Sequence, residues 1–269
     1  MSMNIRPAAV AGMFYPGDGR QLSSEVLAML SVATDPCERQ PKAIIAPHAG
    51  YIYSGPTAAA VYARLIPWGD HIRRVVLLGP CHRVAVNGLA APVADAFATP
   101  LGTVPIDRAA IATIADLPQV GLSDLPHAPE HSLEVHLPFL QAVLETFSLV
   151  PLAVGHASPE QVSEVLERLW GDDETLIVIS TDLSHFMPYD IARQIDRSTC
   201  DAILRLDSGI RPDEACGAYP VNGFLLAAAR HHLRPELVDL RNSGDTAGDK
   251  DRVVGYGAFA FYSPVAGHA

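Results

Sequence analysis

Three short apolar runs, each followed by polar residues and a histidine, constrain most strongly how this chain can fold. The runs span 43–46, 73–78 and 175–179, and the histidines that follow them are His48, His82 and His185. Short apolar runs bounded by proline, glycine and polar residues are typical of strands buried in a sheet. Ligands of open α/β proteins bind beyond the carboxyl ends of such strands. We therefore expect one edge of the sheet to bring these histidines together.

Segments with helical spacing of apolar residues alternate with these strands. Helices are expected at 21–32, 56–65, 107–115, 159–170, 191–206 and 219–232, further strands at 148–154, 236–241 and 253–262, and a loop at 117–129. This alternation favours a mostly parallel, mixed sheet that helices cover on both faces. Residues 1–20 are expected to form a compact arm, and no long linker divides the chain. The sequence therefore predicts an α/β fold, as a single three-layer α/β/α domain over residues 1–269.

Composition excludes several classes of protein. Hydrophobic residues make up 49% of the 269-residue chain and charged residues 18%, which is typical of a globular protein. The net charge is −11 without any basic block, which argues against nucleic-acid binding. No apolar run suits a membrane span and residues 1–17 lack a signal-peptide pattern, so we expect a cytoplasmic protein. The cysteines are too scattered for a disulfide scaffold and are expected to be free thiols: Cys37, Cys81, Cys200 and Cys216.

Histidines at the ends of several strands indicate a metal site. Two neutral imidazoles with an anionic third ligand form a common site for a divalent transition metal. The anionic candidates are Cys216, Asp182, Glu134 and Cys81. A single histidine after a strand more often belongs to a turn, and residues 180–182 alone are more typical of a cap than of a catalytic group. Only the repetition of the pattern favours the metal site.

A second cluster of acidic residues and histidines spans 130–136. Its charged members are expected near the start of a helix, where the helix dipole stabilises acidic side chains. The letters HSLEVH place two histidines five residues apart, which differs from the HExxH pattern of zinc proteases. A P-loop, a GxGxxG turn and a GxSxG elbow are also absent from the sequence.

Six motifs in order carry a resemblance to a known family. They are RPAAVAGMFYP at 6–16, APHAGY at 46–51, GPCH at 79–82, EHSLEVHLPF at 130–139, STDLSH at 180–185 and ACG at 215–217. Together they resemble the Memo family, whose bacterial and archaeal members are called AmmeMemoRadiSam system protein B. The resemblance covers almost the full length. It implies a fold similar to the B-type catalytic subunits of class III extradiol dioxygenases, which use non-haem Fe(II).

The resemblance also implies roles for individual residues. It places metal ligands at His48, His82 and Cys216, an acid/base group at His185, and Asp182 beside it. Because a thiolate is softer than the carboxylate of the related dioxygenases, Cu or Zn are alternatives to Fe(II). A helix that begins after Gly217 is expected to lower the pKa of the Cys216 thiol.

Further residues are expected to line the same pocket. Tyr51 and Tyr53 would form its wall, His131 would lie nearby, and Asp182 or Glu134 would orient an imidazole. The family's usual G-P-S-H is G-P-C-H in this chain, so Cys81 adds a thiol next to His82.

Two classes of function follow from the resemblance. The first is an oxidoreductase that acts on an unidentified small molecule, together with radical-SAM and AMMECR1-like partner proteins. The second is a non-enzymatic metal-binding or peptide-binding protein for signalling, with a vestigial dioxygenase site. Recognition of a phosphopeptide requires arginine or lysine around the pocket, and the motifs contain only Arg6, Lys42 and Arg83 nearby. The sequence therefore favours the oxidoreductase.

Overall fold

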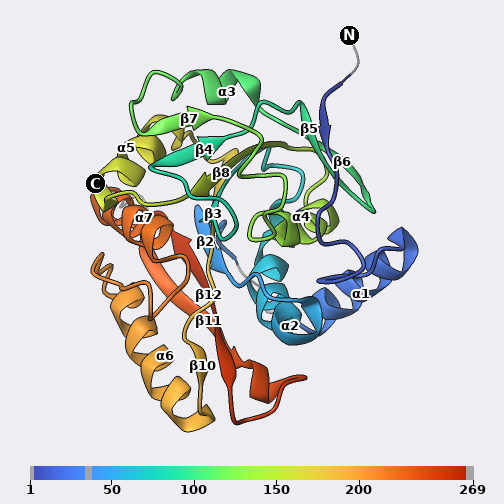
Figure 1. Cartoon of the computed structure of the whole chain (residues 1–269), viewed down its shortest axis with the longest axis vertical. Helices are drawn as coiled ribbons and strands as arrows, with labels where there is room; N and C mark the ends of the chain where they lie inside the picture. Colours follow the sequence, from blue (N-terminus) through green and yellow to red (C-terminus); the bar gives the residue numbers. More distant parts are fainter. Residues whose placement is uncertain (1–2, 34–37, 265–269) are drawn as a thin grey trace.

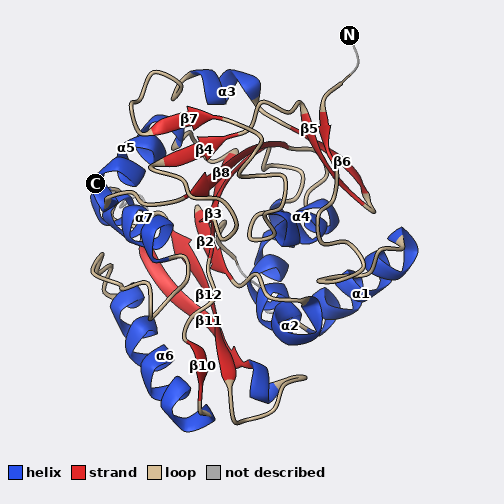
Figure 2. Cartoon of the chain, in the orientation of Figure 1, coloured by secondary structure: helices blue, strands red, loops and turns tan. Residues whose placement is uncertain are grey.

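A mixed sheet forms the centre of the molecule (Figures 1 and 2). The structure is a computed structural model and describes residues 3–33 and 38–264. Its four central strands are parallel and lie in the order β2 (Ala43–Ala46), β9 (Thr175–Ser180), β3 (Arg74–Pro80) and β8 (Ser148–Val154). Beside β2, β12 (Val253–Tyr262) runs antiparallel, and both β11 (Arg234–Asn242) and β10 (His185–Met187) pair with β12. Beyond β8, β4 (Leu89–Ala91) runs antiparallel to β8, and β7 (Val120–Leu122) pairs with β4.

Helices cover both faces of this sheet (Figure 1). One face carries α1 (Gly19–Val32), α2 (Tyr51–Tyr62) and α4 (Leu137–Val143). The opposite face carries α5 (Pro159–Leu169), α6 (Tyr189–Leu204) and α7 (Ala218–Arg230). The short helix α3 (Arg108–Ala112) lies near β8, and the 3-10 turns are η1 (Ala63–Trp68), η2 (Glu134–His136) and η3 (Ser243–Asp245). The expected three-layer α/β fold with a mostly parallel mixed sheet is confirmed.

The central strands form because nearly all of their side chains are apolar. Every residue of β2 and of β9 is buried, as expected for strands that helices cover on both faces. The helix α5 begins with a capping box between Ser158 and Gln161 and buries one apolar stripe against α7. Among the described residues, no helix combines the length and the apolarity that a membrane span needs.

The N-terminal arm is anchored by a buried ion pair. Arg6, in the short strand β1 (Ile5–Arg6), donates to a carboxylate oxygen of Glu134 at 2.6 Å, and both side chains are buried. The same carboxylate accepts the hydroxyl of Tyr15 at 2.5 Å and two backbone N–H groups of the arm. The strand β1 pairs with β5 (Ala96–Thr99), which pairs with β6 (Gly102–Pro105), in a separate small sheet. The arm is therefore compact, as the sequence predicts.

Three local expectations are wrong. The helix expected at 56–65 begins at Tyr51, with Gly50 as its N-cap residue, and Pro56 lies in its second turn, where it lacks the N–H that would bond four residues back. Tyr51 and Tyr53 therefore lie in the first turn of α2 and not in a loop. The segment before α4 forms a 3-10 turn only from Glu134, so Glu130 precedes any helix. The strand β7 lies within 117–129, which the sequence suggested to be a loop.

Candidate metal centre

Three neighbouring strands bring the candidate ligands to one edge of the sheet. The strand β9 pairs with β2 on one side and with β3 on the other, all in parallel register. His48 follows β2, Ser180 and Asp182 stand at the end of β9, and His82 follows β3. Because parallel strands end on the same side, these side chains converge.

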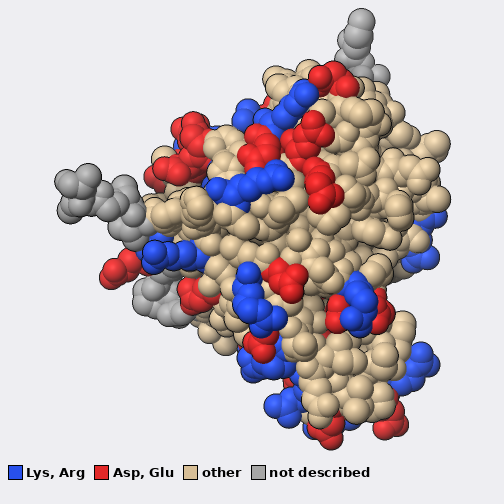
Figure 3. All heavy atoms as spheres, turned by 90° about the vertical axis from the view of Figure 1, so that its left-hand side faces the viewer, with Lys and Arg blue, Asp and Glu red and all other residues tan. Residues whose placement is uncertain are grey.

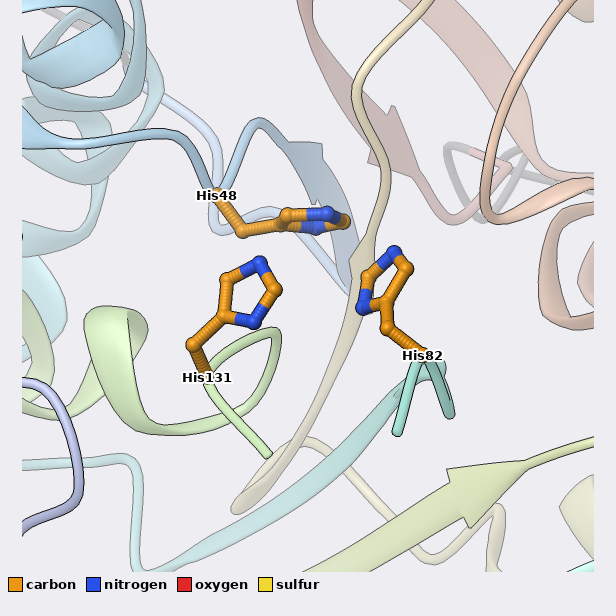
Figure 4. A group of neighbouring side chains, drawn as sticks. All are labelled: His48, His82 and His131. Atoms are coloured by element: carbon orange, nitrogen blue, oxygen red, sulfur yellow. The ribbon is translucent and has the colours of Figure 1, made fainter. Parts of the chain in front are cut away.

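Three imidazole rings meet at this edge (Figure 4). The ligand atoms of His48, His82 and His131 lie within 4.8 Å of one another, which is close enough for a shared metal ion. The ring centroids are 5.2 Å apart for His48 and His82, and 4.8 Å apart for His82 and His131. Their side chains are 2%, 29% and 14% exposed, in the order His48, His82 and His131. The group is therefore closed behind His48 and reached by solvent at His82.

Hydrogen bonds fix the protonation of His48. Its Nδ1 lies 2.6 Å from the Ser180 hydroxyl, and that hydroxyl donates its own hydrogen to the Ser132 carbonyl at 2.7 Å. The Ser180 oxygen can therefore only accept from the imidazole, so Nδ1 carries the hydrogen. The lone pair of the His48 Nε2 remains available for a ligand. Neither serine was among the residues that the sequence suggested, although both lie within the quoted motifs.

Glu130 has the same role for His82. One carboxylate oxygen lies 2.9 Å from the His82 Nδ1 and 3.2 Å from the His131 Nδ1, and the other accepts the His82 backbone N–H at 2.6 Å. Burial alone would raise the pKa of Glu130, but the hydrogen bonds from His82 and from the Ser132 N–H outweigh burial and lower this pKa to about 2. A carboxylate behind a metal-binding imidazole orients the ring and strengthens its basicity. The sequence suggested Asp182 or Glu134 for this role.

The imidazoles of His48 and His131 are held in their neutral form. Burial, together with the neighbouring histidines, lowers the pKa of His48 well below its ordinary value. Burial also lowers the pKa of His131 to about 4, against the opposing charge of Glu130. Neutral imidazoles are the form that binds metals, so protons do not compete with an ion at these two residues near pH 7.

Cys216 adds a sulfur to the group. Its Sγ lies 3.4 Å from the His48 Nε2 and accepts the Asp182 backbone N–H at 3.3 Å. Burial and the nearby Asp182 carboxyl raise the pKa of the thiol to about 12. The expectation of a lowered pKa is therefore wrong, because the hydrogen bond from Gly217 at the start of α7 is outweighed by burial. The other described cysteines, Cys81 and Cys200, are also free thiols, and Cys37 lies outside the described residues.

Asp182 and His185 lie next to these ligands. Asp182 accepts the His48 backbone N–H at 2.8 Å, and its other oxygen is 3.9 Å from the His48 Nε2. Burial raises the pKa of the Asp182 carboxyl to about 7. The His185 Nδ1 donates to the Leu183 carbonyl at 2.8 Å, which leaves Nε2 as a proton acceptor, and burial lowers the pKa of this imidazole. Asp182 is therefore able to exchange a proton near neutral pH, and the His185 imidazole presents its Nε2 as a proton acceptor.

The remaining suggested residues are engaged elsewhere. Tyr51 is buried and donates its hydroxyl to the Val135 carbonyl at 2.6 Å, whereas Tyr53 is 36% exposed. Glu134 is bound by the N-terminal arm, and Cys81 directs its thiol to the Val84 carbonyl at 3.1 Å. Burial raises the pKa of the Cys81 thiol. The described geometry brings none of these four into the group of imidazoles.

Comparisons with known proteins find relatives that match nearly the whole chain. A family model described as Memo-like protein matches residues 6–260. A MEMO1 family protein of Aquifex aeolicus is 39% identical over 94% of this chain and 98% of its own length. A MEMO1 family protein of Methanosarcina barkeri is 36% identical over the same shares. An uncharacterized protein of Escherichia coli K12 has a similar fold, with a TM-score of 0.52 at 13% identity over 82% of this chain and 99% of that one.

Proposed function

Since this chain belongs to the Memo-like protein family, we propose that it is a metal-dependent oxidoreductase with a site of the non-haem iron dioxygenase type. The observation that carries the proposal is the group of three imidazoles at one sheet edge, within 4.8 Å of one another. The Nδ1 atoms of His48 and His82 are each hydrogen-bonded to an acceptor, so the lone pair of each ring lies on its Nε2. Such preparation of two nitrogen donors is typical of a metal site.

The donors present fit a transition metal ion. His48 and His82 would hold the ion, and Cys216, 3.4 Å from the His48 Nε2, would supply the anionic ligand. Nitrogen and thiolate donors suit Fe(II), Cu and Zn, and they do not suit Mg²⁺ or Ca²⁺. His131 would remain beside the ion with Glu130 behind it. We propose Fe(II) as the resident ion.

The surrounding residues support proton transfer to and from a substrate. When bound, Fe(II) supplies the redox centre at which a substrate reacts with O₂. His185 would accept a proton from a substrate hydroxyl at its free Nε2 and return it later, because a neutral imidazole is a good base near pH 7. Asp182, whose carboxyl has a pKa of about 7, would hold a second proton beside His48.

Metal content tests the proposed ligands. Protein purified without oxygen is expected to hold about one Fe(II) per chain, and His48→Ala and His82→Ala are expected to abolish binding. His71→Ala is the matched control because His71 is exposed and remote from the group. Cys216→Ser is expected to lose most of the metal and His131→Asn to retain it. The reverse result would assign the third position to His131.

Oxygen consumption tests the oxidoreductase itself. A small-molecule library screened with the Fe(II) protein is expected to yield substrates whose turnover consumes O₂ and falls sharply in His185→Gln. His185→Gln is expected to keep its metal, because His185 is not among the three grouped histidines. A protein that binds Fe(II) fully but shows no substrate-dependent O₂ uptake would favour the non-enzymatic metal-binding function.

A further inference from the structure

One cavity shares no lining residue with the three grouped histidines. It has a volume of about 710 Å³ and lies between α6, β11 and η3. This volume is in the range of small-molecule sites in proteins. Residues from 190–197 and 240–245 line it, and none of the grouped histidines does. On this side of the molecule, basic and acidic side chains lie close together in the lower part of the view (Figure 3).

Three arginines line the cavity. Arg193 and Arg197 are four residues apart on α6 and therefore lie on the same side of the helix, and Arg241 lines the cavity from β11. Arg197 makes no hydrogen bond or ion pair with any described residue, and Arg193 only lies over the Tyr189 ring, with 5.7 Å from its guanidinium carbon to the ring centroid. The Nε of Arg241 binds Asp239, which leaves its terminal nitrogens for another partner. Asp190 and Asp201, three and four residues from these arginines on α6, form no ion pair with them within the described residues, so a bound anion would relieve the repulsion between Arg193 and Arg197.

The acidic residues of the cavity are already hydrogen-bonded to protein groups. Asp245 accepts the Tyr189 hydroxyl at 2.5 Å and the Asn242 backbone N–H at 3.0 Å. Asp196 is buried at the back of the cavity and accepts the Ser184 N–H at 2.9 Å. Asp190 alone is exposed and without such a bond, at the start of α6. The guanidinium groups are therefore the donors that remain free inside the cavity.

We propose that this cavity binds a small molecule that carries a phosphate group. A phosphate offers three oxygens and close to two negative charges, which matches three guanidinium groups better than the two oxygens of a carboxylate. Gln194 and Asn242, which also line the cavity, would contact the uncharged part of the ligand. The site is independent of the proposed metal chemistry, because the two share no residue.

Titration calorimetry with metal-free protein tests this inference. Inorganic phosphate and a phosphomonoester, glycerol phosphate, are expected to bind, and glycerol phosphate more tightly because it also fills the cavity. The double variant Arg193→Met/Arg197→Met is expected to bind roughly tenfold more weakly or worse, since it lacks two charge-assisted contacts. Arg205→Met is the matched control, because Arg205 follows α6 but does not line the cavity.

Two further measurements separate this site from others. His82→Ala is expected to bind phosphate as the wild type does, and loss of binding there would overturn the inference by placing the phosphate at the metal centre. Succinate is expected to bind far more weakly than phosphate, and equal binding would overturn the preference for a phosphate. The single variant Arg197→Glu, at an exposed position, is a second test of the cavity, and its melting temperature shows whether the variant protein folds. Unchanged phosphate binding in both arginine variants would also overturn the inference.

Discussion

At the scale of single residues, the hydrogen bonds behind the imidazoles matter as much as the imidazoles. Glu130 contacts both His82 and His131, and Ser180 determines which nitrogen of His48 carries the hydrogen. These acceptors hold the rings before any ion arrives, so the cost of ordering them is met during folding. The affinity of the site for a metal ion should therefore depend also on residues that do not touch the ion.

Replacement of Glu130 by glutamine is predicted to weaken metal binding. The amide would keep the shape but offer one acceptor oxygen in place of two, so either the contacts with both imidazoles or the contact with the His82 backbone N–H would be lost. We expect affinity to fall roughly 10–100-fold, measured by competition with a chelator. Glu145→Gln is the control, because Glu145 is exposed and away from the site. Equal affinities for wild type and Glu130→Gln would contradict a positioning role.

Metal binding is predicted to release one proton from Cys216. Its thiol has a pKa of about 12 without metal, so it is protonated at pH 7 and must lose its hydrogen to become a ligand. Affinity should then rise about tenfold per pH unit above pH 7, because each unit raises the share of thiolate tenfold. Calorimetry in buffers with different ionisation enthalpies measures the released proton. Cys216→Ser should remove both the proton release and the slope, and persistence of either would exclude Cys216 as a ligand.

At the scale of secondary-structure elements, a buried ion pair connects the N-terminal arm to the turn η2. The Arg6 guanidinium donates to Glu134 and to the carbonyls of His127 and Glu130. A buried ion pair adds little over a well-packed apolar pair, but removal of one partner leaves the other charge buried alone. Replacement of either partner alone is therefore expected to weaken the attachment of the arm.

Arg6→Met is predicted to destabilise the fold strongly. Since Glu134 is fully buried, loss of its cation should cost about 3–5 kcal/mol in the free energy of unfolding, measured with urea. The double variant Arg6→Met/Glu134→Gln should recover part of this loss. Arg168→Met removes an exposed pair with Asp116 and should cost no more than about 1 kcal/mol. Similar costs for Arg6→Met and Arg168→Met would contradict this account of the arm.

The sequence was informative about the strands and less so about what lies between them. The apolar runs of β2 and β9 identify buried strands, so the meeting of His48 with His82 was predictable from parallel topology. The start of α2 was not, because Pro56 suggested a boundary that tertiary packing overrides. The roles of Glu130 and Ser180 depend on contacts between segments about fifty residues apart, as in the pairs His82 with Glu130 and Ser180 with Ser132. Patterns within a short stretch of sequence do not predict such contacts.

At the scale of the whole molecule, buried histidines make stability depend on pH. Burial lowers the pKa of His127 to about 4 and of His136 to about 3, from an unfolded value near 6.5. The unfolded chain therefore binds more protons below pH 6.5, so the stability contributed by these residues is present above that pH and is lost as the pH falls. Asp182 and Asp196, with pKa values of about 7 and about 6 raised by burial, oppose this trend in part.

His136→Gln is predicted to flatten the acid limb of the stability curve. Glutamine cannot be protonated, so the variant should lose less stability than the wild type between pH 6.5 and about pH 4. Urea midpoints at pH 7 and pH 5 measure the difference. His71→Gln, at an exposed position, should follow the wild type. A parallel loss in all three proteins would show that His136 does not contribute to acid unfolding.

The stretch 130–136 makes contacts with two separate parts of the molecule. Within 130–136, Glu130 faces the imidazoles while Glu134 faces the N-terminal arm. Arg6 spans both, because it also binds the Glu130 carbonyl at 2.7 Å. The N-terminal arm is thus connected, through Arg6, to the stretch that also carries the contacts of the histidine cluster. Arg6 is synthesised well before its partner Glu134. The histidine cluster can therefore reach its final arrangement only after both residues have left the ribosome.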